Sequence, residues 1–350
     1  MQSLKFRPLL TSNSLAKVLL RHSTFTVNLN VKAIDSIEIA ADKVFGPGKK
    51  VNVKVYDNQG RLQNGSQMNI MQREDGFYMN YNRSEDDKLV VNLPLTARLT
   101  DFDVKIHGIK ANVTIQDLLM KSLKVELEQG NVLLKSIRLN DVEVTTANDI
   151  TTKELYGGQL DKIALNSSDG HVDVSECRCS ELTVIGKTVQ ITNCFNSINR
   201  FRASLSLIIK NLLGNSQIKA DGEKFVLSGF AGTFRALLGT RENSLEFLML
   251  HGHDNEVTFS HPDANSYMSF SNAMGSRLTK ILIHAKPEII TQTAEDFTLS
   301  RLGEKLFEIV RNDGGDGDST LNIKFDEGKE LKLHKQTWKD AFKWAKNLFN

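Results

Sequence analysis

The sequence predicts an all-β protein: a single-chain β-solenoid, similar to a parallel β-helix, with a short helix at its C-terminal end. Three observations predict this architecture. A triplet of apolar residues recurs at a regular interval, a second alternating apolar stretch precedes several of the triplets, and one segment near the C-terminus has helical periodicity.

The triplet places apolar residues at positions i, i+2 and i+5, as in Val132, Leu134 and Ile137. Eight such triplets begin at anchors 17 to 22 residues apart. Of their 24 positions, 23 are apolar, with Thr152 as the exception, whereas a hydrophobic content of 40% alone would give about ten. The anchors are Val113, Val132, Ile150, Val172, Val189, Leu207, Phe225 and Leu245.

The spacing has a physical interpretation. Residues i and i+2 lie on one face of a strand, two polar residues then turn a corner, and residue i+5 re-enters the interior. A coil of about 19 residues cannot bury its apolar face alone, so coils are predicted to stack in parallel, about 4.8 Å apart. A β-sandwich is the alternative, but its turn signals recur more often, roughly every 8 to about 12 residues, and do not explain the longer repeat. The preceding alternating stretches are Leu123 and Val125, Val142 and Val144, and Ile163 and Leu165.

The repeat divides the chain into four regions: residues 1–25, 26–94, 95–275 and 276–350. Region 26–94 alternates like β-structure and forms either the first coils or a small antiparallel cap. Beyond 275 the triplet fades, leaving a helix or strand at 304–310 and a hairpin-like pattern at 320–335.

Residues 337–349 are helical by pattern, with an aromatic face that includes Trp338 and Phe342 and a separate lysine face. An open solenoid end invites aggregation, so this helix is predicted to cap it. The alternative is that the helix lies on an anionic membrane surface.

The first 25 residues predict a mitochondrial presequence. Their basic residues are Lys5, Arg7, Lys17 and Arg21, and no acidic residue occurs before Asp35. An acid-free segment rich in Ser, Thr, Leu and basic residues is typical of such a presequence, and the apolar core of a secretory signal is missing. We expect a mitochondrial protein, in the matrix, from which about 22 to 25 residues are removed. A basic tail on a cytosolic protein and a secreted protein are the alternatives.

Charge argues against a nucleic-acid partner. The formal net charge is +2, with 44 basic and 42 acidic residues, and without the four basic residues of the first 22 positions the balance is 40 to 42. A nearly neutral body lacks the basic face that displaces counterions from nucleic acid. The apolar runs are short, so no transmembrane segment is predicted.

Three groups of candidate site residues have structural interpretations. Cys177 and Cys194 occupy the i+5 slot of consecutive triplets, so we expect them stacked and buried, and Cys177, Cys179 and Cys194 lack a fourth ligand at zinc-like spacing. The segment 312–320 resembles a calcium loop only in composition and is interpreted as a turn. A turn is also the interpretation of His251, His253, Asp254, Glu256 and His261. No catalytic residue, metal site or cofactor is predicted.

The segments LVVNLPLTARL (89–99), LKVELEQGNVLLKSI (123–137) and KQTWKDAFK (335–343), taken with the repeat, resemble a known family. They are similar to the animal "family with sequence similarity 185 member A" proteins, which carry a bacterial-type putative-adhesin-like β-repeat domain. The resemblance covers roughly residues 85–345. It implies a β-solenoid and carries over no catalytic residues. Asn148 stands where other coils have Gly130 and Gly170, a departure that puts the register of its coil in doubt.

The predicted function is therefore a non-enzymatic mitochondrial β-solenoid that serves as a scaffold or protein-interaction surface for an unidentified protein partner. The alternative is a β-helical carbohydrate-active enzyme or carbohydrate-binding protein. A groove in which Asp, Arg and Lys side chains converge would favour the alternative.

Overall fold

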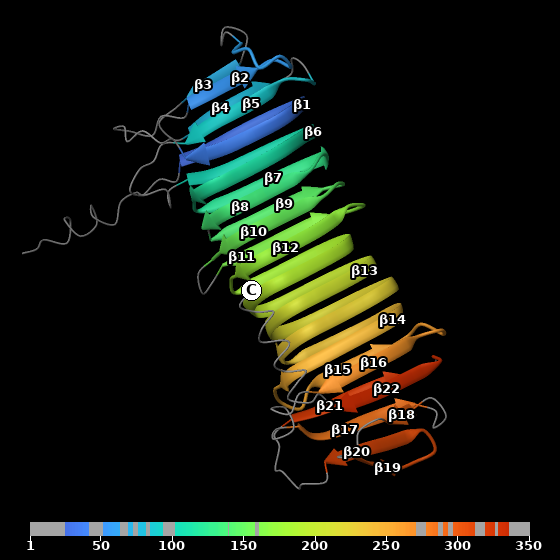
Figure 1. Cartoon of the computed structure of the whole chain (residues 1–350). Helices are drawn as coiled ribbons and strands as arrows, with labels where there is room; N and C mark the ends of the chain where they lie inside the picture. Colours follow the sequence, from blue (N-terminus) through green and yellow to red (C-terminus); the bar gives the residue numbers. More distant parts are fainter. Residues whose placement is uncertain are drawn as a thin grey trace, which may run out of the picture.

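The computed structural model describes residues 25–41, 52–63, 69–72, 76–81, 85–93, 102–138, 140–157, 161–270, 278–285, 290–292, 297–311, 319–325 and 328–335. Every regular element in these ranges is a β-strand, and together they form one 22-stranded sheet. The strands run across the long axis of a rod and stack along it (Figure 1). None of the residues described belongs to a helix long and apolar enough to cross a membrane.

The middle of the rod is a stack of parallel coils in chain order. On one side, β7 lies beside β9 and β9 beside β11; on the other, β8 lies beside β10 and β10 beside β12. The longer strands β6, β13 and β14 run around the corner and contribute to both sides. The bounds are β6 Phe102–Leu119, β7 Ser122–Gln129, β8 Val132–Arg138, β9 Asp141–Thr146, β10 Ile150–Tyr156, β11 Lys162–Ser167, β12 His171–Arg178, β13 Glu181–Gly232 and β14 Phe234–Leu250.

The strand register follows the apolar triplets. Val132 pairs with Val113 on one side and with Ile150 on the other, and Ile150 pairs in turn with Val172. The residues of the alternating stretches, such as Leu123 and the others of its series, are buried on the facing side. Both sets belong to a single apolar core, which runs the length of the described stack.

A left-handed residue explains why the third apolar position is i+5 and not i+4. Simple alternation would turn residue i+4 inward, but in six coils this residue has a φ angle of 51° to 59°. The left-handed residue shifts the alternation by one, so in β8 Ile137 points inward after Ser136. The six residues are Asp117, Ser136, Glu154, Glu176, Asn193 and Asn211, and Gly229 continues the series with a φ of 74°.

At position 130, where the chain turns from one side to the other, a close backbone contact requires glycine. A Cβ atom on Gly130 would lie 1.8 Å from the backbone oxygen of Ala111 in the coil before it, and its φ is 121°. Asn148 replaces glycine one coil later, where its Oδ1 accepts a hydrogen bond of 2.9 Å from the amide of Gly130. The coil that contains Asn148 keeps the register of its neighbours.

The N-terminal end departs from chain order. Strand β1 pairs in parallel with β6 on one side and with β4 and β5 on the other, so the first coil lies one position inside the stack. Antiparallel strands β2 and β3 then flank β5 and β4. Strands β1, β4 and β5 therefore stack in parallel with the central coils (Figure 1). The bounds are β1 Phe25–Ala41, β2 Asn52–Tyr56, β3 Asn69–Gln72, β4 Gly76–Tyr81 and β5 Lys88–Leu93.

The C-terminal end repeats this arrangement. The coil made of β21 and β22 lies between the coil of β15 and β16 and the coil of β17 and β18, although it comes last in the chain (Figure 1). Strands β20 and β19 then add to β17 in antiparallel fashion. The bounds are β15 Asn255–Phe259, β16 Asn265–Phe270, β17 Leu278–Ala285, β18 Ile290–Gln292, β19 Phe297–Arg301, β20 Leu306–Arg311, β21 Ser319–Phe325 and β22 Glu330–Lys335.

Two expectations are wrong, one about this end and one about β14. The pattern at 320–335 is not a hairpin, because β21 and β22 pair with other coils in parallel and form two sides of one coil. The triplet anchored at Leu245 is out of register, because Leu245 pairs with Leu227 and not with Phe225. Asn243 takes the anchor position instead, and it is buried with hydrogen bonds to Thr240 and Ser266.

The sequence allowed either a helix or a strand at 304–310. The structure has a strand there, because residues 306–310 belong to β20. The predicted C-terminal helix at 337–349 lies outside the described residues.

Candidate functional site

One corner of the rod carries a ladder of exposed side chains, one from each coil. These residues follow directly after the buried i+5 position, so they point outward. Leu119 pairs with Arg138, Arg138 with Tyr156, and Tyr156 with Arg178. Apolar and guanidinium groups therefore alternate over these four coils. We call this set the corner ladder: Leu119, Arg138, Tyr156, Arg178, Phe195 and Leu213.

The last two members continue the same series. Cys177 pairs with Cys194, which places Phe195 beside Arg178. A hydrogen bond of 2.7 Å from Asn211 Nδ2 to Asn193 Oδ1 joins the next two coils just before Phe195 and Leu213. The four apolar members are unusually exposed for large side chains, between 40% and 47% of their surface.

The corner ladder lines an open groove with a volume of about 1180 Å³. Its remaining walls are small or polar, and include Asn140, Gly157, Asp161, Ser180 and Ser197. A Cβ atom on Gly157 would approach the Cβ of Asp161 to 2.9 Å, so glycine at this position allows the Asp161 side chain to pack against it.

Buried amides hold the groove floor in place. Asn196 Oδ1 accepts hydrogen bonds from the backbone amide of Cys179, at 2.9 Å, and from its thiol, at 3.2 Å. Its Nδ2 donates to Asn199 Oδ1 at 2.9 Å, and Asn199 donates to Ser216 Oγ at 3.3 Å. Since satisfied buried networks fix side-chain positions, the floor is rigid.

The groove carries positive charge at its rim and one carboxyl group in its wall. Arg138 and Arg178 are exposed, and no carboxylate among the described residues forms an ion pair with either guanidinium. Asp161 is only 8% exposed. Burial, and then the negative charge of Asp141, raise the pKa of the Asp161 carboxyl group above its ordinary value.

The Toastrack DUF4097 family matches residues 23–221, which is more than half of the 350-residue chain. The chain belongs to this family. Strand β1 and all strands up to most of β13, including all six coils of the corner ladder, fall inside the matched part of this Toastrack chain.

The other comparisons add little. No curated protein matches the Toastrack chain. Among solved structures, the crystal structure of a putative cell adhesion protein from Clostridium sporogenes is similar over 90% of this chain and 94% of its own, at 10% sequence identity and a TM-score of 0.18. A TM-score this low carries no argument about fold or function. Neither comparison supports the animal family named from the sequence, so that finer resemblance stays a prediction.

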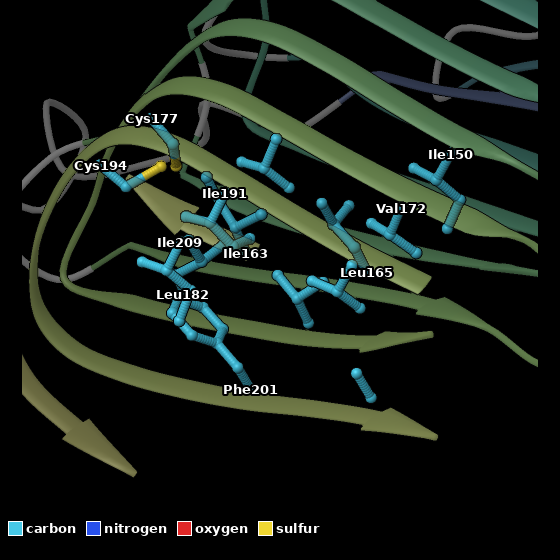
Figure 2. Close-up of a cluster of buried hydrophobic side chains, with 14 of the residues drawn as sticks. Ile150, Ile163, Leu165, Val172, Cys177, Leu182, Ile191, Cys194, Phe201 and Ile209 are labelled. Atoms are coloured by element: carbon cyan, nitrogen blue, oxygen red, sulfur yellow. The ribbon is translucent and has the colours of Figure 1, made fainter. Parts of the chain in front are cut away.

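The three cysteines of the Toastrack chain lie in its core. Cys177 and Cys194 are buried free cysteines at paired positions of neighbouring strands, as the triplet predicted. Their sulfur atoms lie side by side in Figure 2. The thiols of Cys179 and Cys194, together with burial, raise the pKa of Cys177 well above the ordinary value of a thiol. A protonated, buried thiol is a poor nucleophile and a poor metal ligand.

Of the histidine-rich group, His251, His253 and Asp254 lie in the turn between β14 and β15, and His261 lies in the turn after β15. Glu256 does not lie in a turn, as was expected, but in β15. Asp254 forms an ion pair with Arg235 and Glu256 one with Lys324, while His261 Nδ1 accepts a hydrogen bond from the amide of Asp263. The described residues include no group of three or more His, Cys, Asp or Glu side chains placed to hold a metal ion.

Several predicted residues lie outside the part of the chain that the structure describes. These are the basic residues of the proposed presequence, most of the segment 312–320, and the aromatic residues of the proposed cap: Lys5, Arg7, Lys17, Arg21, Trp338 and Phe342.

The corner ladder was not predicted from the sequence. Its signal was present, because every member stands at position i+6 of an apolar triplet. Arginine and aromatic residues that recur at one outward-facing position of successive repeats have no role in the core. Such a position indicates a binding surface.

Proposed function

We propose that this protein is a non-enzymatic mitochondrial β-solenoid, with about 19 residues per coil, that binds a partner protein along its corner ladder. The observation that supports the proposal is a row of exposed side chains across six successive coils, in which apolar residues and arginines alternate from Leu119 to Phe195 and Leu213 adds a further apolar residue. Tyr, Phe and Arg are side chains that binding surfaces favour.

The backbone supports a binding role. Each ladder residue sits on a strand that pairs with a coil on both sides, as β10 does with β8 and β12. Such residues lose little backbone freedom when a partner binds, which lowers the entropic cost of association.

A paired substitution tests the proposal. Tyr156→Ala with Phe195→Ala removes the two rings of the ladder, and Leu133→Ala with Leu237→Ala removes two similarly exposed apolar side chains elsewhere on the rod. Proteins recovered with the tagged chain from mitochondria are quantified for both variants. Loss with the ring variant alone supports the proposal, and equal recovery with wild type and both variants contradicts it.

The mitochondrial location is part of the same proposal and is supported by the composition of residues 1–25. We expect removal of about 22 to 25 residues on import into the matrix. The mature N-terminus of a C-terminally tagged protein, sequenced from cells, tests this. An intact Met1 in a cytosolic pool contradicts it.

We also propose that residues 26–94 form the N-terminal coils, 95–275 the central repeat, and 276–350 a C-terminal region ending in a capping helix with Trp338 and Phe342. Trp338→Ala with Phe342→Ala should then lower the melting temperature and promote aggregation in lipid-free buffer. Unchanged stability with loss of binding to cardiolipin vesicles supports the membrane-surface alternative instead.

A carbohydrate-active or carbohydrate-binding protein is the second candidate. Arg138, Arg178 and Asp161, whose pKa is raised, line one groove, and perturbed carboxyl groups in grooves are frequent in active sites. The near-complete burial of Asp161 limits its access to a substrate. Hydrolysis of acidic oligosaccharides that is lost in Asp161→Asn, with folding intact, would establish this candidate over the first.

A further inference from the structure

We propose that the occupant of the corner groove is an acidic, proline-rich segment of the partner, bound in the polyproline II conformation. This inference rests on the proposed function, because it names the kind of segment that the ladder recognises. It is carried by the spacing of the ladder, by its chemistry, and by the pairing of the strands beneath it.

The spacing of the ladder matches a polyproline II helix. Neighbouring coils of a parallel stack lie about 4.8 Å apart, so Arg138 and Arg178, which are two coils apart, are separated by about 9.6 Å. The same separation applies to the rings of Tyr156 and Phe195. A polyproline II helix has three residues per turn and a rise of about 3.1 Å, so every third residue recurs at about 9.3 Å. In an extended strand, the side chains on one face recur at about 6.6 to 6.8 Å. This distance does not match the spacing of about 9.6 Å between side chains two coils apart.

The chemistry of the ladder fits two acidic residues placed three positions apart. Two carboxylates at positions i and i+3 of the bound segment would reach Arg138 and Arg178 together. Guanidinium groups bind carboxylates through two parallel hydrogen bonds. The two residues between them would straddle the ring of Tyr156, which stands midway between the guanidiniums. Proline rings suit this place, because aromatic-lined grooves are the usual docking sites of polyproline II segments.

Addition of a β-strand is not available in the middle of this surface. The strands that carry Arg138, Tyr156 and Arg178 each have a hydrogen-bonded neighbour on both sides. Their backbone groups are therefore used within the stack, and recognition must come from side chains. A polyproline II segment satisfies its own conformation without backbone pairing, so it loses little on binding to such a surface.

The length of the ladder sets the length of the segment. Six coils give five intervals, or about 24 Å, which corresponds to seven or eight residues of polyproline II. The one acidic wall residue, Asp161, is buried against Gly157, whereas both guanidiniums are exposed. The accessible charge in the groove is therefore positive.

A labelled nine-residue peptide of three Glu-Pro-Pro units provides the test, by fluorescence anisotropy with the full chain. The control peptide has the same composition with its three glutamates placed together. We expect the periodic peptide to bind at least tenfold more tightly than the control. The affinity should fall as salt shortens the screening length, because the ladder is exposed.

Two protein variants locate the binding. Arg138→Ala with Arg178→Ala should weaken binding of the periodic peptide at least tenfold. Lys135→Ala with Lys153→Ala removes two exposed cations from β8 and β10 outside the groove, and should change the affinity less than twofold. Unchanged thermal melting of both variants excludes misfolding as the cause.

The outcomes separate this inference from the proposed function. Equal affinity for the two peptides, or equal weakening by the arginine and lysine variants, overturns the inference. If the ring variant still loses its partner from mitochondria in that case, the proposed function stands with a different kind of segment. Tighter, arginine-dependent binding of an oligouronate than of the periodic peptide overturns the inference in favour of the carbohydrate candidate.

Discussion

The middle of the rod and its two ends are built by different rules. In the middle, each coil stacks on the coil that precedes it in the chain, and strand pairs join residues 17 to 22 positions apart, as in Val172 with Val189 and Ile150 with Val172. At the ends, the first and last coils are inserted one position inside the stack. Phe259 pairs with Phe325, and several other strands lie between these two residues in the chain.

The difference shows how a solenoid can protect its ends. A parallel stack leaves open strand edges, which invite pairing with other molecules. Here the coil of β1 and the coil of β21 and β22 have neighbours on both sides. Antiparallel strands β2, β3, β20 and β19 extend the described ends, whereas β18 pairs in parallel with β22. Local stacking builds the middle, whereas contacts across long stretches of chain build the ends.

The largest expected effect compares a buried charge at an end with one in the middle. Ile323 is fully buried between Val257 and Ile283, and Ile191 is fully buried in the middle beside Val174. Either Ile→Asp substitution should cost about 3–5 kcal/mol locally, because the carboxylate has no partner. Coils interact only with their neighbours, so the damage should spread differently.

Hydrogen exchange distinguishes the two cases. With Ile323→Asp, amides of β15 to β22 should lose protection while those of β8 to β12 keep it. With Ile191→Asp, protection should fall on both sides of the substituted coil. Equal global loss in both variants would mean that the ends and the middle are one cooperative unit.

A smaller effect concerns the one polar side chain in the triplets. Thr152 Oγ1 is the buried side-chain oxygen that has no hydrogen-bond partner within the described residues. Thr152→Val keeps the shape and removes the unpaired hydroxyl, so it should stabilise the protein by about 1–3 kcal/mol in denaturant unfolding. The converse substitution at its neighbour, Val174→Thr, should destabilise the protein; a gain in stability there would contradict this explanation.

The left-handed position sharpens the comparison further, since among the described residues it recurs in the middle coils and not in the inserted ones. Glu176 has a φ of 55°, a conformation that costs most side chains about 1–2 kcal/mol and asparagine less. Glu176→Asn should therefore raise the unfolding free energy by up to about 1 kcal/mol. Glu176→Val should lower it, and a neutral result for valine would show that the backbone is not strained here.

The smallest effect is an ion pair that ties the inserted last coil to its neighbour. Lys324 Nζ lies 2.7 Å from Glu256 Oε1, and this hydrogen bond lowers the pKa of Glu256 although burial opposes it. A carboxyl group whose pKa is lower in the folded than in the unfolded state stabilises the fold at pH values above its unfolded-state pKa. This stabilisation is lost as the pH falls through the folded-state pKa. Both side chains are partly exposed, so the contribution should be about 0.2–1 kcal/mol.

Unfolding of wild type and Lys324→Met at neutral and acidic pH measures this contribution. The two proteins should differ at neutral pH and converge in acid. A difference that persists in acid would assign the effect to packing of the lysine side chain.

The sequence predicted the middle of the rod well because there one physical rule repeats. Apolar residues at i, i+2 and i+5 are enough to place Val113 beside Val132 and Cys177 beside Cys194. The rule failed at Leu245, where a buried, hydrogen-bonded Asn243 fills an apolar slot, since a polarity pattern cannot anticipate a satisfied amide.

The ends could not be predicted in this way. The alternation in β21 and β22 fits a hairpin as well as two sides of a coil, and only contacts with β15 to β18 decide between them. The corner ladder was missed for a different reason. The period was searched for buried residues, whereas Tyr156 and Arg178 are outward-facing residues of the same period.

The insertion of the terminal coils can be tested most directly by disulfide cross-linking. Thr258 pairs with Lys324, which pairs in turn with His284, and all three side chains lie outside the buried core. A disulfide requires Cα atoms within about 7 Å, so Thr258→Cys with Lys324→Cys should cross-link rapidly, whereas Thr258→Cys with His284→Cys, about 9.6 Å apart, should not. Rapid cross-linking of the second pair and not the first would show that the coils stack in chain order, which contradicts the insertion.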